Sequence, residues 1–170
     1  MVSYLDELVN AIKGTNWASI DRLMDQLKQT RAVGRTLFVC GNGGSHAVAI
    51  HWAVDLMKVA NLEVHALGTN HALLTALAND IDYEAGLSTE LSMRAHPGDI
   101  LVALSCSGRS RNIVSTLGAS KKLRMPTYML TGLKAPEFAE VHTIRIQSMD
   151  YGILEDVFSA VGHYITREMS

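Results

Sequence analysis

The sequence is poor in cysteine and contains no long apolar run. Cys40 and Cys106 are its two cysteines in 170 residues, which is too few for a disulfide scaffold and is typical of a reducing compartment. The uninterrupted apolar runs are far shorter than a membrane span. The first ten residues carry acidic side chains where a secretory signal would carry a basic region. We therefore expect a cytoplasmic protein without a membrane partner.

An excess of charge of one sign is also lacking. Fifteen lysines and arginines stand against 17 aspartates and glutamates, and no basic stripe is visible, so nucleic acid is not expected as a partner. Hydrophobic residues make up 48% and charged residues 19% of the chain, as in ordinary globular proteins. No Pro/Gly/Ser-rich linker or internal repeat divides the sequence. We expect a single domain over residues 1–170 that buries a core without disulfides or a structural metal.

Apolar residues recur at helical spacing in the first 33 residues. Gly14 ends a first pattern, and Asn16 can cap a second helix. The second helix has Trp17 and Leu23 on its apolar side. We interpret residues 1–33 as a helical hairpin that packs on the domain and on a neighbouring subunit.

The rest of the chain alternates short β-rich runs with helical stretches. Strands are predicted over 36–40, 63–66, 99–104, 127–131 and 142–147, and helices over 45–59, 71–78, 83–95, 112–123 and 153–169. Strands that alternate with helices are typical of a parallel sheet covered by helices on both faces. The pattern therefore predicts an α/β fold.

Two polar loops follow predicted buried strands. They read Gly41-Asn-Gly-Gly-Ser45 and Ser105-Cys-Ser-Gly-Arg-Ser110. In open α/β sheets ligands bind outside the carboxyl ends of the strands, and a helix N-terminus there offers free N–H groups and a positive dipole end. Four hydroxyl groups and two helix N-termini suit a phosphate monoester, although either loop alone could be an ordinary turn with capping serines. The first loop matches neither nucleotide fingerprint, so no nucleotide cofactor is expected.

Cys106 lies within the second of these loops. A helix N-terminus can lower the pKa of a thiol and make it reactive. No second cysteine and no obvious base lie near Cys106 in the sequence. We therefore interpret its thiol as inert.

Histidines and carboxylates form two further pairs at helical spacing. His51 and Asp55 are four residues apart and fall within about 40° of each other on one helix face. Glu155 and His163 are eight residues apart, an offset of about 80° that allows both to point into one cleft. The four side chains could form a tetrahedral zinc site, an acid–base pair, or solvated surface pairs without a function.

The two serine-bearing loops together resemble the SIS (sugar isomerase) domain family, and the chain is most similar to its phosphoheptose isomerases. Three further segments carry this resemblance. His51-Trp-Ala-Val-Asp55 resembles the family's His-Phe-Ala-Glu-Glu, Ala78-Asn-Asp80 with Tyr83 resembles Gly-Asn-Asp-x-x-Tyr/Phe, and Leu154-Glu-Asp156 through His163 resembles the spacing from Gln-Glu to His. The similarity runs over nearly the whole chain.

The resemblance implies a three-layer αβα sandwich with a five-stranded parallel sheet, and a homotetramer whose active sites are shared between subunits. It implies that substrate and phosphate contact Asn42, Gly43, Ser45, Asp80, Ser105, Cys106, Ser107, Ser110 and Glu155. Asp55 matches the catalytic glutamate of the family and His163 its catalytic histidine. A zinc ion could be held by His51, Asp55, Glu155 and His163.

The implied reaction converts sedoheptulose 7-phosphate into D-glycero-D-manno-heptose 7-phosphate through an enediol. Asp55 is one methylene shorter than the family's glutamate, and Glu155 stands where the isomerases commonly have glutamine. Two alternatives therefore stay open. The chain could isomerise another sugar phosphate, or it could be a non-catalytic phosphosugar-binding or protein-interaction module.

Overall fold

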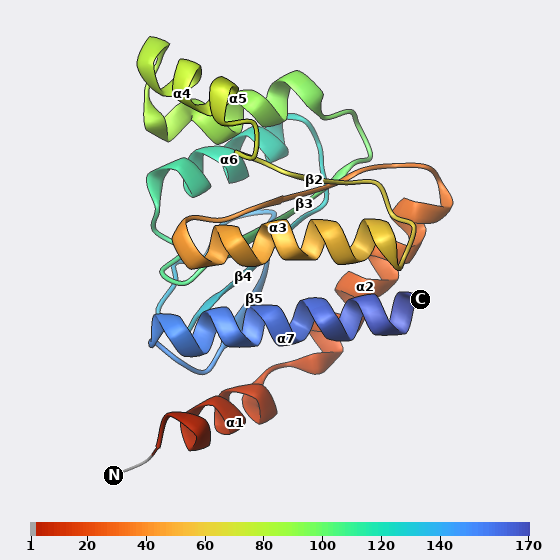
Figure 1. Cartoon of the computed structure of the whole chain (residues 1–170), viewed down its shortest axis with the longest axis vertical. Coiled ribbons are helices and arrows are strands. Elements are labelled where there is room, and N and C mark those ends of the chain that lie inside the picture. Colours follow the sequence, from red (N-terminus) through yellow and green to blue (C-terminus); the bar gives the residue numbers. More distant parts are fainter. Residues whose placement is uncertain (1–2) are drawn as a thin grey trace.

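The computed structural model describes residues 3–170 and contains one five-stranded sheet flanked by helices (Figure 1). The strands are β1 (Leu37–Cys40), β2 (Val64–Ala66), β3 (Ile100–Ser105), β4 (Thr127–Gly132) and β5 (His142–Ile146). The helices are α1 (Tyr4–Gly14), α2 (Trp17–Ala32), α3 (Gly43–Lys58), α4 (His71–Asp80), α5 (Tyr83–Arg94), α6 (Arg111–Lys122) and α7 (Tyr151–Met169). Every strand and helix predicted after residue 33 is confirmed, with ends that lie within two residues of the prediction.

All neighbouring strands are parallel, and their order in the sheet is β2-β1-β3-β4-β5. The chain first moves from β1 to one edge of the sheet and then returns to build the other edge from β3. The order therefore reverses between β1 and β3. Loops that follow these two strands diverge to opposite faces of the sheet and leave a crevice between them. The two polar loops are the ones that follow β1 and β3.

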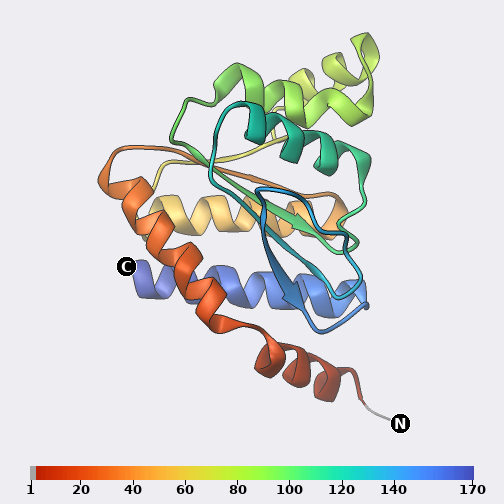
Figure 2. The same cartoon turned by 180° about the vertical axis from the view of Figure 1, so that it is seen from behind.

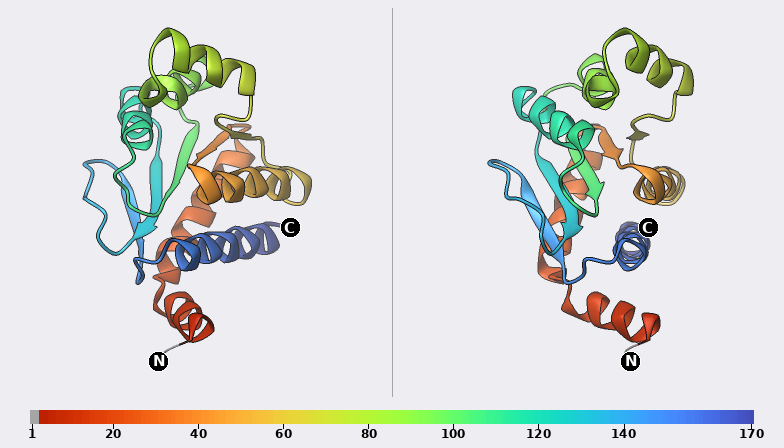
Figure 3. Two further views of the ribbon diagram at one scale, coloured as in Figure 1. Left: turned by 60° about the vertical axis from the view of Figure 1, so that its left-hand side comes forward. Right: turned by 90° about the vertical axis from the view of Figure 1, so that its left-hand side faces the viewer.

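Alternating strand residues build two separate apolar layers, which confirms the predicted three-layer sandwich. Leu37 and Val39 face a core formed with α1, α2, α3 and α7. Phe38 and Cys40 face a second core formed with α5 and α6. Figure 3 shows these two groups of helices on opposite sides of the sheet. None of the helices within residues 3–170 combines the length and apolarity needed to cross a bilayer.

The two N-terminal helices are present, but they do not fold back on each other as a hairpin. Figures 1 and 2 show α1 and α2 following one another at an angle, and both pack on α7. The linker explains this arrangement, because Thr15 has extended backbone angles and Asn16 caps α2 before the chain can reverse. Leu23 is fully buried within its own chain, and Trp17 packs edge-on against Tyr164.

Helices α3 and α7 lie side by side because Gly162 has no side chain. The indole of Trp52 lies directly against Gly162, where a Cβ atom would overlap it. Trp52 donates its Nε1–H to the carbonyl oxygen of Phe158 at 2.9 Å, and its side chain is buried. Figure 1 shows that the two helices run in the same direction from the carboxyl edge of the sheet. Residues at the same depth along α3 and α7 therefore face one another.

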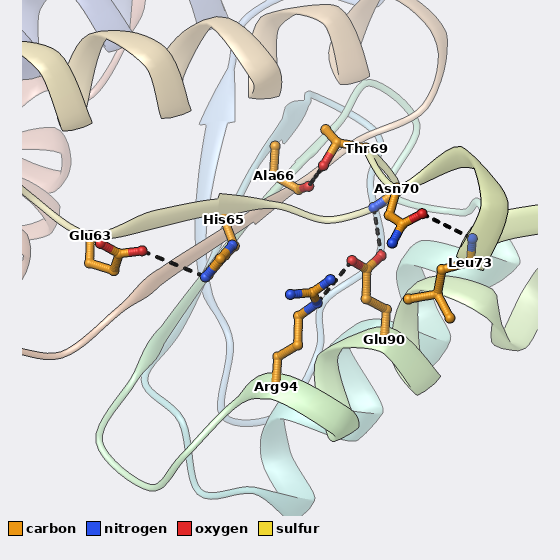
Figure 4. Close-up of polar contacts among 9 residues, drawn as sticks. Glu63, His65, Ala66, Thr69, Asn70, Leu73, Glu90 and Arg94 are labelled. Atoms are coloured by element: carbon orange, nitrogen blue, oxygen red, sulfur yellow. Dashed lines mark hydrogen bonds and ion pairs between the residues drawn. The ribbon is translucent and has the colours of Figure 1, made fainter.

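A buried carboxylate fixes the loop that follows β2. The side chain of Glu90 on α5 is 4% exposed, and it accepts a hydrogen bond of 2.8 Å from the N–H of Gly68. Its other oxygen pairs with Arg94 at 3.2 Å, as Figure 4 shows. Gly68 has a φ of +86°, a backbone angle that residues other than glycine rarely adopt. These contacts hold the start of α4 next to the β1 loop.

Candidate active site

The loop after β1 presents the N-terminus of α3 to the crevice. Asn42 lies just before the helix, and its side chain exchanges two hydrogen bonds of 2.8 and 2.9 Å with Asn112 on α6. Tyr83 donates a third hydrogen bond to Asn42 at 3.3 Å. Gly43 has a φ of +54°, a conformation that glycine adopts without strain. The paired asparagines therefore tie the β1 loop to the β3 loop across the crevice.

The loop after β3 brings three serines to the N-terminus of α6. Ser105 is buried and accepts a hydrogen bond from the N–H of Gly108. Ser107 accepts a hydrogen bond from the N–H of Arg109 at 3.1 Å, so its own hydroxyl hydrogen is left for a ligand. Together with the β1 loop these residues enclose a pocket lined by Asn42, Ser45, Leu104, Ser105, Cys106, Ser107, Ser110, Tyr151 and Glu155.

Glu155 places a carboxylate in this pocket, against the first turn of α3. Its Oε1 accepts a hydrogen bond from the Ser45 hydroxyl at 3.1 Å. A Cβ atom on Gly44 would overlap the Glu155 carboxylate, so the glycine allows this close approach. A helix N-terminus stabilises negative charge, and here a side chain of the chain itself supplies it. An incoming phosphate is therefore best accommodated at the other helix, α6, beside Ser107 and Ser110.

A second group of functional side chains lies further along the same two helices. His51 and His163 face each other with their Nε2 atoms 2.9 Å apart. Asp55 Oδ2 lies 3.4 Å from the His51 Nε2 and 3.9 Å from the His163 Nε2. The close packing at Gly162 and Trp52 brings α3 and α7 near enough for this contact. All three side chains remain partly exposed to solvent.

The three residues have donor atoms of the kinds that zinc uses. Their ligand atoms all lie within 4.8 Å of one another. Two imidazole nitrogens bound tetrahedrally to one zinc ion at about 2.0–2.1 Å would lie about 3.3 Å apart, against 2.9 Å between His51 and His163 here. A small outward shift of the rings is enough to admit an ion. The group His51, Asp55 and His163 therefore fits a metal.

Glu155 does not join this group, although it is one of the four zinc ligands expected from the sequence. An eight-residue separation along a helix corresponds to a rise of about 12 Å, so Glu155 lies more than two turns from His163 on α7. It contacts Ser45 at the other end of the crevice instead. The angular offset on the helix was favourable, but the rise along the axis separates the two side chains.

Comparison with known proteins identifies a family for most of the chain. The family model described as SIS domain matches residues 2–132. The chain belongs to the SIS domain family. The phosphoheptose isomerase of Maridesulfovibrio salexigens is 37% identical over 139 residues, which cover 78% of this chain and 68% of that protein. The probable phosphoheptose isomerase of Thermoplasma acidophilum is 32% identical over 169 residues, which cover 95% and 93%.

Solved structures share the fold of this SIS domain at low sequence identity. Phosphoheptose isomerase GmhA from Neisseria gonorrhoeae superposes with a TM-score of 0.90 at 22% identity, covering 98% of this chain and 96% of that one. The Vibrio vulnificus NanR protein complexed with ManNAc-6P superposes with a TM-score of 0.73 at 16% identity, covering 97% and 58%. The SIS fold of this chain is thus found in proteins with different names.

The thiol of Cys106 in this SIS domain is protected from ionisation. Burial is the largest cause that raises its pKa, and the neighbouring Glu155 carboxylate acts in the same direction. The Ser45 hydroxyl, 3.5 Å from the sulfur, acts in the opposite direction and is outweighed. These contacts favour the interpretation of Cys106 as an inert side chain in the wall of the pocket.

One residue that the resemblance suggests as a site residue lies apart from the pocket. Two other residues, which the sequence did not suggest, line the pocket or support it. Asp80 is exposed at the end of α4 and accepts a hydrogen bond from its neighbour Asn79. Asn112 pairs with Asn42, and Tyr151 forms part of the pocket wall. Both occupy the first turn of a helix that begins at the carboxyl edge of the sheet, and that position was the available signal.

Proposed function

We propose that this SIS domain is a phosphosugar isomerase that converts sedoheptulose 7-phosphate into D-glycero-D-manno-heptose 7-phosphate. The observation that carries the proposal is the occurrence of both parts of such a site in one chain. A serine-lined pocket lies between two helix N-termini, and a His–Asp–His group lies further along α3 and α7. The name phosphoheptose isomerase, which relatives of at least 32% identity carry, supports the same substrate class.

The phosphate end of the sugar would be held by the β3 loop. Ser105, Ser107 and Ser110 surround the N-terminus of α6, where the helix dipole favours an anion. Ser45 and Glu155 line the opposite wall, where a hydroxyl and a carboxylate can bind sugar hydroxyl groups. This arrangement fixes one end of the substrate and leaves its carbonyl end free for reaction.

Proton transfer would be carried out by Asp55 and His163. Asp55 takes the proton from the carbon beside the carbonyl group, which leaves an enediol, and returns it to the neighbouring carbon. The His163 imidazole moves the hydroxyl proton between the two oxygens, as imidazole can at neutral pH. The same three side chains, His51, Asp55 and His163, would alternatively hold a zinc ion that polarises the carbonyl oxygen as a Lewis acid. In that case Asp55 and His163 would act as metal ligands, and the proton transfers would need another group.

The function is tested by incubating the purified protein with sedoheptulose 7-phosphate and following the aldoheptose 7-phosphate by NMR. We expect the heptose to be interconverted, and hexulose and pentulose phosphates serve as the comparison substrates. Turnover of one of these in place of the heptose would reassign the substrate. Tight binding of a sugar phosphate without turnover of any of these substrates would overturn the proposal that the protein is an isomerase.

A binding module without catalysis is the second candidate, and one observation favours it. Glu155 stands where the isomerases commonly have glutamine, so the wall of the pocket differs beside Ser45, whereas the serines at the start of α6 are in place to hold a phosphate. The NanR structure, which is complexed with ManNAc-6P, has the same fold. Binding of a sugar phosphate in the pocket, with the His–Asp–His group idle, would give this function.

Substitution of Ser107 by alanine should weaken sugar phosphate binding about ten- to a hundredfold. The reason is the loss of a hydrogen bond to a charged group, worth about 1.5–3 kcal/mol. Isothermal titration calorimetry measures the change. Ser92→Ala is the matched control, because the hydroxyl of Ser92 bonds to its own helix α5 and to nothing else among residues 3–170. Unchanged affinity in Ser107→Ala would remove this serine from the site.

We also propose a homotetramer in which subunits share active sites. Ile50, Val54 and Met57 form an exposed apolar row on α3, 38–48% exposed, and Leu5 and Val9 are exposed on α1. The pocket and the His–Asp–His group are about 12 Å apart along α7. The His–Asp–His group of a neighbouring subunit would complete the active site if it lies nearer to the pocket than the group of the same chain.

Light scattering at micromolar concentration should give about four times the 18.5 kDa mass of one chain. A mass of 18.5 kDa would contradict both the tetramer and the shared site. Ile50→Glu places a charge in the apolar row and should dissociate the assembly. The control Lys122→Glu changes a charge on α6 and should leave the tetramer intact.

The two cysteines are free, which supports a cytoplasmic location of the protein.

A further inference from the structure

A second cavity lies at the edge of the sheet opposite the serine-lined pocket. It measures about 320 Å³ and is lined by Ser19, Arg22, Tyr128, Val141, His142, Thr143 and Ile144. We call it the distal cavity. Its walls are α2 and the first residues of β4 and β5, whereas the serine-lined pocket follows the carboxyl ends of β1 and β3. None of the seven lining residues is acidic.

Arg22 brings an uncompensated positive charge to the distal cavity. Its guanidinium donates a hydrogen bond of 2.7 Å to the Ser19 hydroxyl. Within the described part of the chain no carboxylate pairs with it, whereas Arg94, Arg111 and Arg145 each pair with a glutamate. Because Ser19 accepts from Arg22, the Ser19 hydroxyl hydrogen remains available to a further acceptor.

Most of the Tyr128 side chain is buried, and the residue lines the distal cavity. The residue is 8% exposed, and no hydrogen bond joins its hydroxyl to any of residues 3–170. Tyr4, Tyr83 and Tyr164, by contrast, each donate to a side-chain oxygen. The hydroxyl group of Thr143, another lining residue, is fully buried without a hydrogen-bond partner among residues 3–170, and a buried hydroxyl usually finds one. Burial raises the pKa of Tyr128, while the nearby Arg22 guanidinium acts in the opposite direction, so the two groups face the same space.

His142 completes the polar side of the distal cavity. It pairs with Tyr128 in the register of β4 and β5, and the two rings stack with their centroids 4.8 Å apart. The imidazole has no hydrogen-bond or ion-pair partner among the side chains that the structure describes. Four groups that can donate hydrogen bonds, on Ser19, Arg22, Tyr128 and His142, therefore line a cavity that has no carboxylate in its wall.

We propose that the distal cavity binds a phosphate group, carried by inorganic phosphate or by a small phosphate ester. A phosphate has three terminal oxygens for donors that approach from different walls, and a guanidinium binds it in a bidentate manner. The Arg22 guanidinium supplies the charge, and the hydroxyl groups of Ser19 and Tyr128 supply neutral hydrogen bonds. This site is separate from the serine-lined pocket and from the proposed isomerase reaction.

The ring signals of His142 in NMR spectra report on the distal cavity alone, because this histidine is remote from the serine-lined pocket. At fixed pH, inorganic phosphate should shift these signals in the wild-type protein. Arg22→Gln should raise the phosphate concentration needed about ten- to a hundredfold, and Tyr128→Phe about three- to tenfold. Lys28→Gln, which removes a charge from the same helix, is the matched control and should leave the titration unchanged.

Sedoheptulose 7-phosphate and inorganic phosphate are titrated in parallel to distinguish the two sources of the phosphate group. A lower midpoint for the ester assigns the cavity to phosphate esters, and a lower midpoint for phosphate assigns it to the free ion. His142 signals that do not respond to either compound would overturn the proposal. An equal response in Arg22→Gln and in the wild type would also overturn it.

Discussion

Replacement of His163 by glutamine should lower isomerase turnover about 10²–10⁴-fold, the usual effect of removing a general acid–base group. Glutamine keeps the polarity and approximate size of the side chain but cannot exchange a proton at neutral pH. His163 contacts His51 and lies 3.9 Å from Asp55, so its loss removes the group that moves the hydroxyl proton. The measurement is kcat for sedoheptulose 7-phosphate.

Binding of the substrate should survive this substitution. His163 lies about 12 Å from Glu155 along α7, and the serines of the pocket are on other elements. The control variant His96→Gln, at an exposed position on the loop after α5, should keep full turnover. Metal content is measured in parallel, because loss of zinc from His163→Gln would assign the defect to the ion. Wild-type turnover in His163→Gln would remove this residue from the mechanism.

Substitution of Gly162 by alanine should reduce the free energy of unfolding by about 2–6 kcal/mol. Its Cβ atom would overlap the indole ring of Trp52, and overpacking of a core costs about 1–3 kcal/mol. The displaced indole would also lose its buried hydrogen bond to Phe158, which costs about 1–3 kcal/mol more. Urea denaturation followed by circular dichroism measures the loss.

Gly118→Ala is the matched control for this prediction. Gly118 also lies within a helix, α6, but a Cβ atom there would meet open space. Alanine should therefore stabilise the protein by about 0.5–1 kcal/mol, the ordinary difference in helix propensity. Equal effects of the two substitutions would show that the contact between α3 and α7 is not close. Gly162→Ala should also lower turnover, since it separates His51 from His163.

The sequence predicts the fold well because local patterns determine it. Short β-rich apolar runs mark the strands and apolar residues at helical spacing mark the helices, and the alternation of the two is typical of a parallel sheet. The loops after β1 and β3 were recognisable as a ligand site for the same reason. Both follow a fully buried strand, such as Leu37–Cys40, and both begin a helix with serine or glycine.

Contacts between distant residues were not predictable in this way. The pairing of Asn42 with Asn112 and of Ser45 with Glu155 depends on how two helices are placed on the sheet. The angle of a side chain around a helix axis follows from the sequence, but its partner along the axis does not. The expected zinc site therefore grouped Glu155 with His163, whereas the structure places Glu155 in the serine-lined pocket, with other residues expected to contact the substrate. The distal cavity joins α2 to β4 and β5, and no sequence motif marks it.

Because the Glu155 carboxylate lies at the start of α3, a ligand group that enters this side of the pocket must replace a contact that already exists. Without a ligand, the Ser45 hydroxyl is already bonded to this carboxylate, so the loop is organised in advance and little ordering is left to the substrate. A sugar hydroxyl group that binds to Ser45 or Glu155 gains only the difference between its own contacts and those it disturbs. Because weaker holding of this kind is expressed mainly as faster dissociation, the same carboxylate that precedes the substrate in the pocket would hasten the departure of the product.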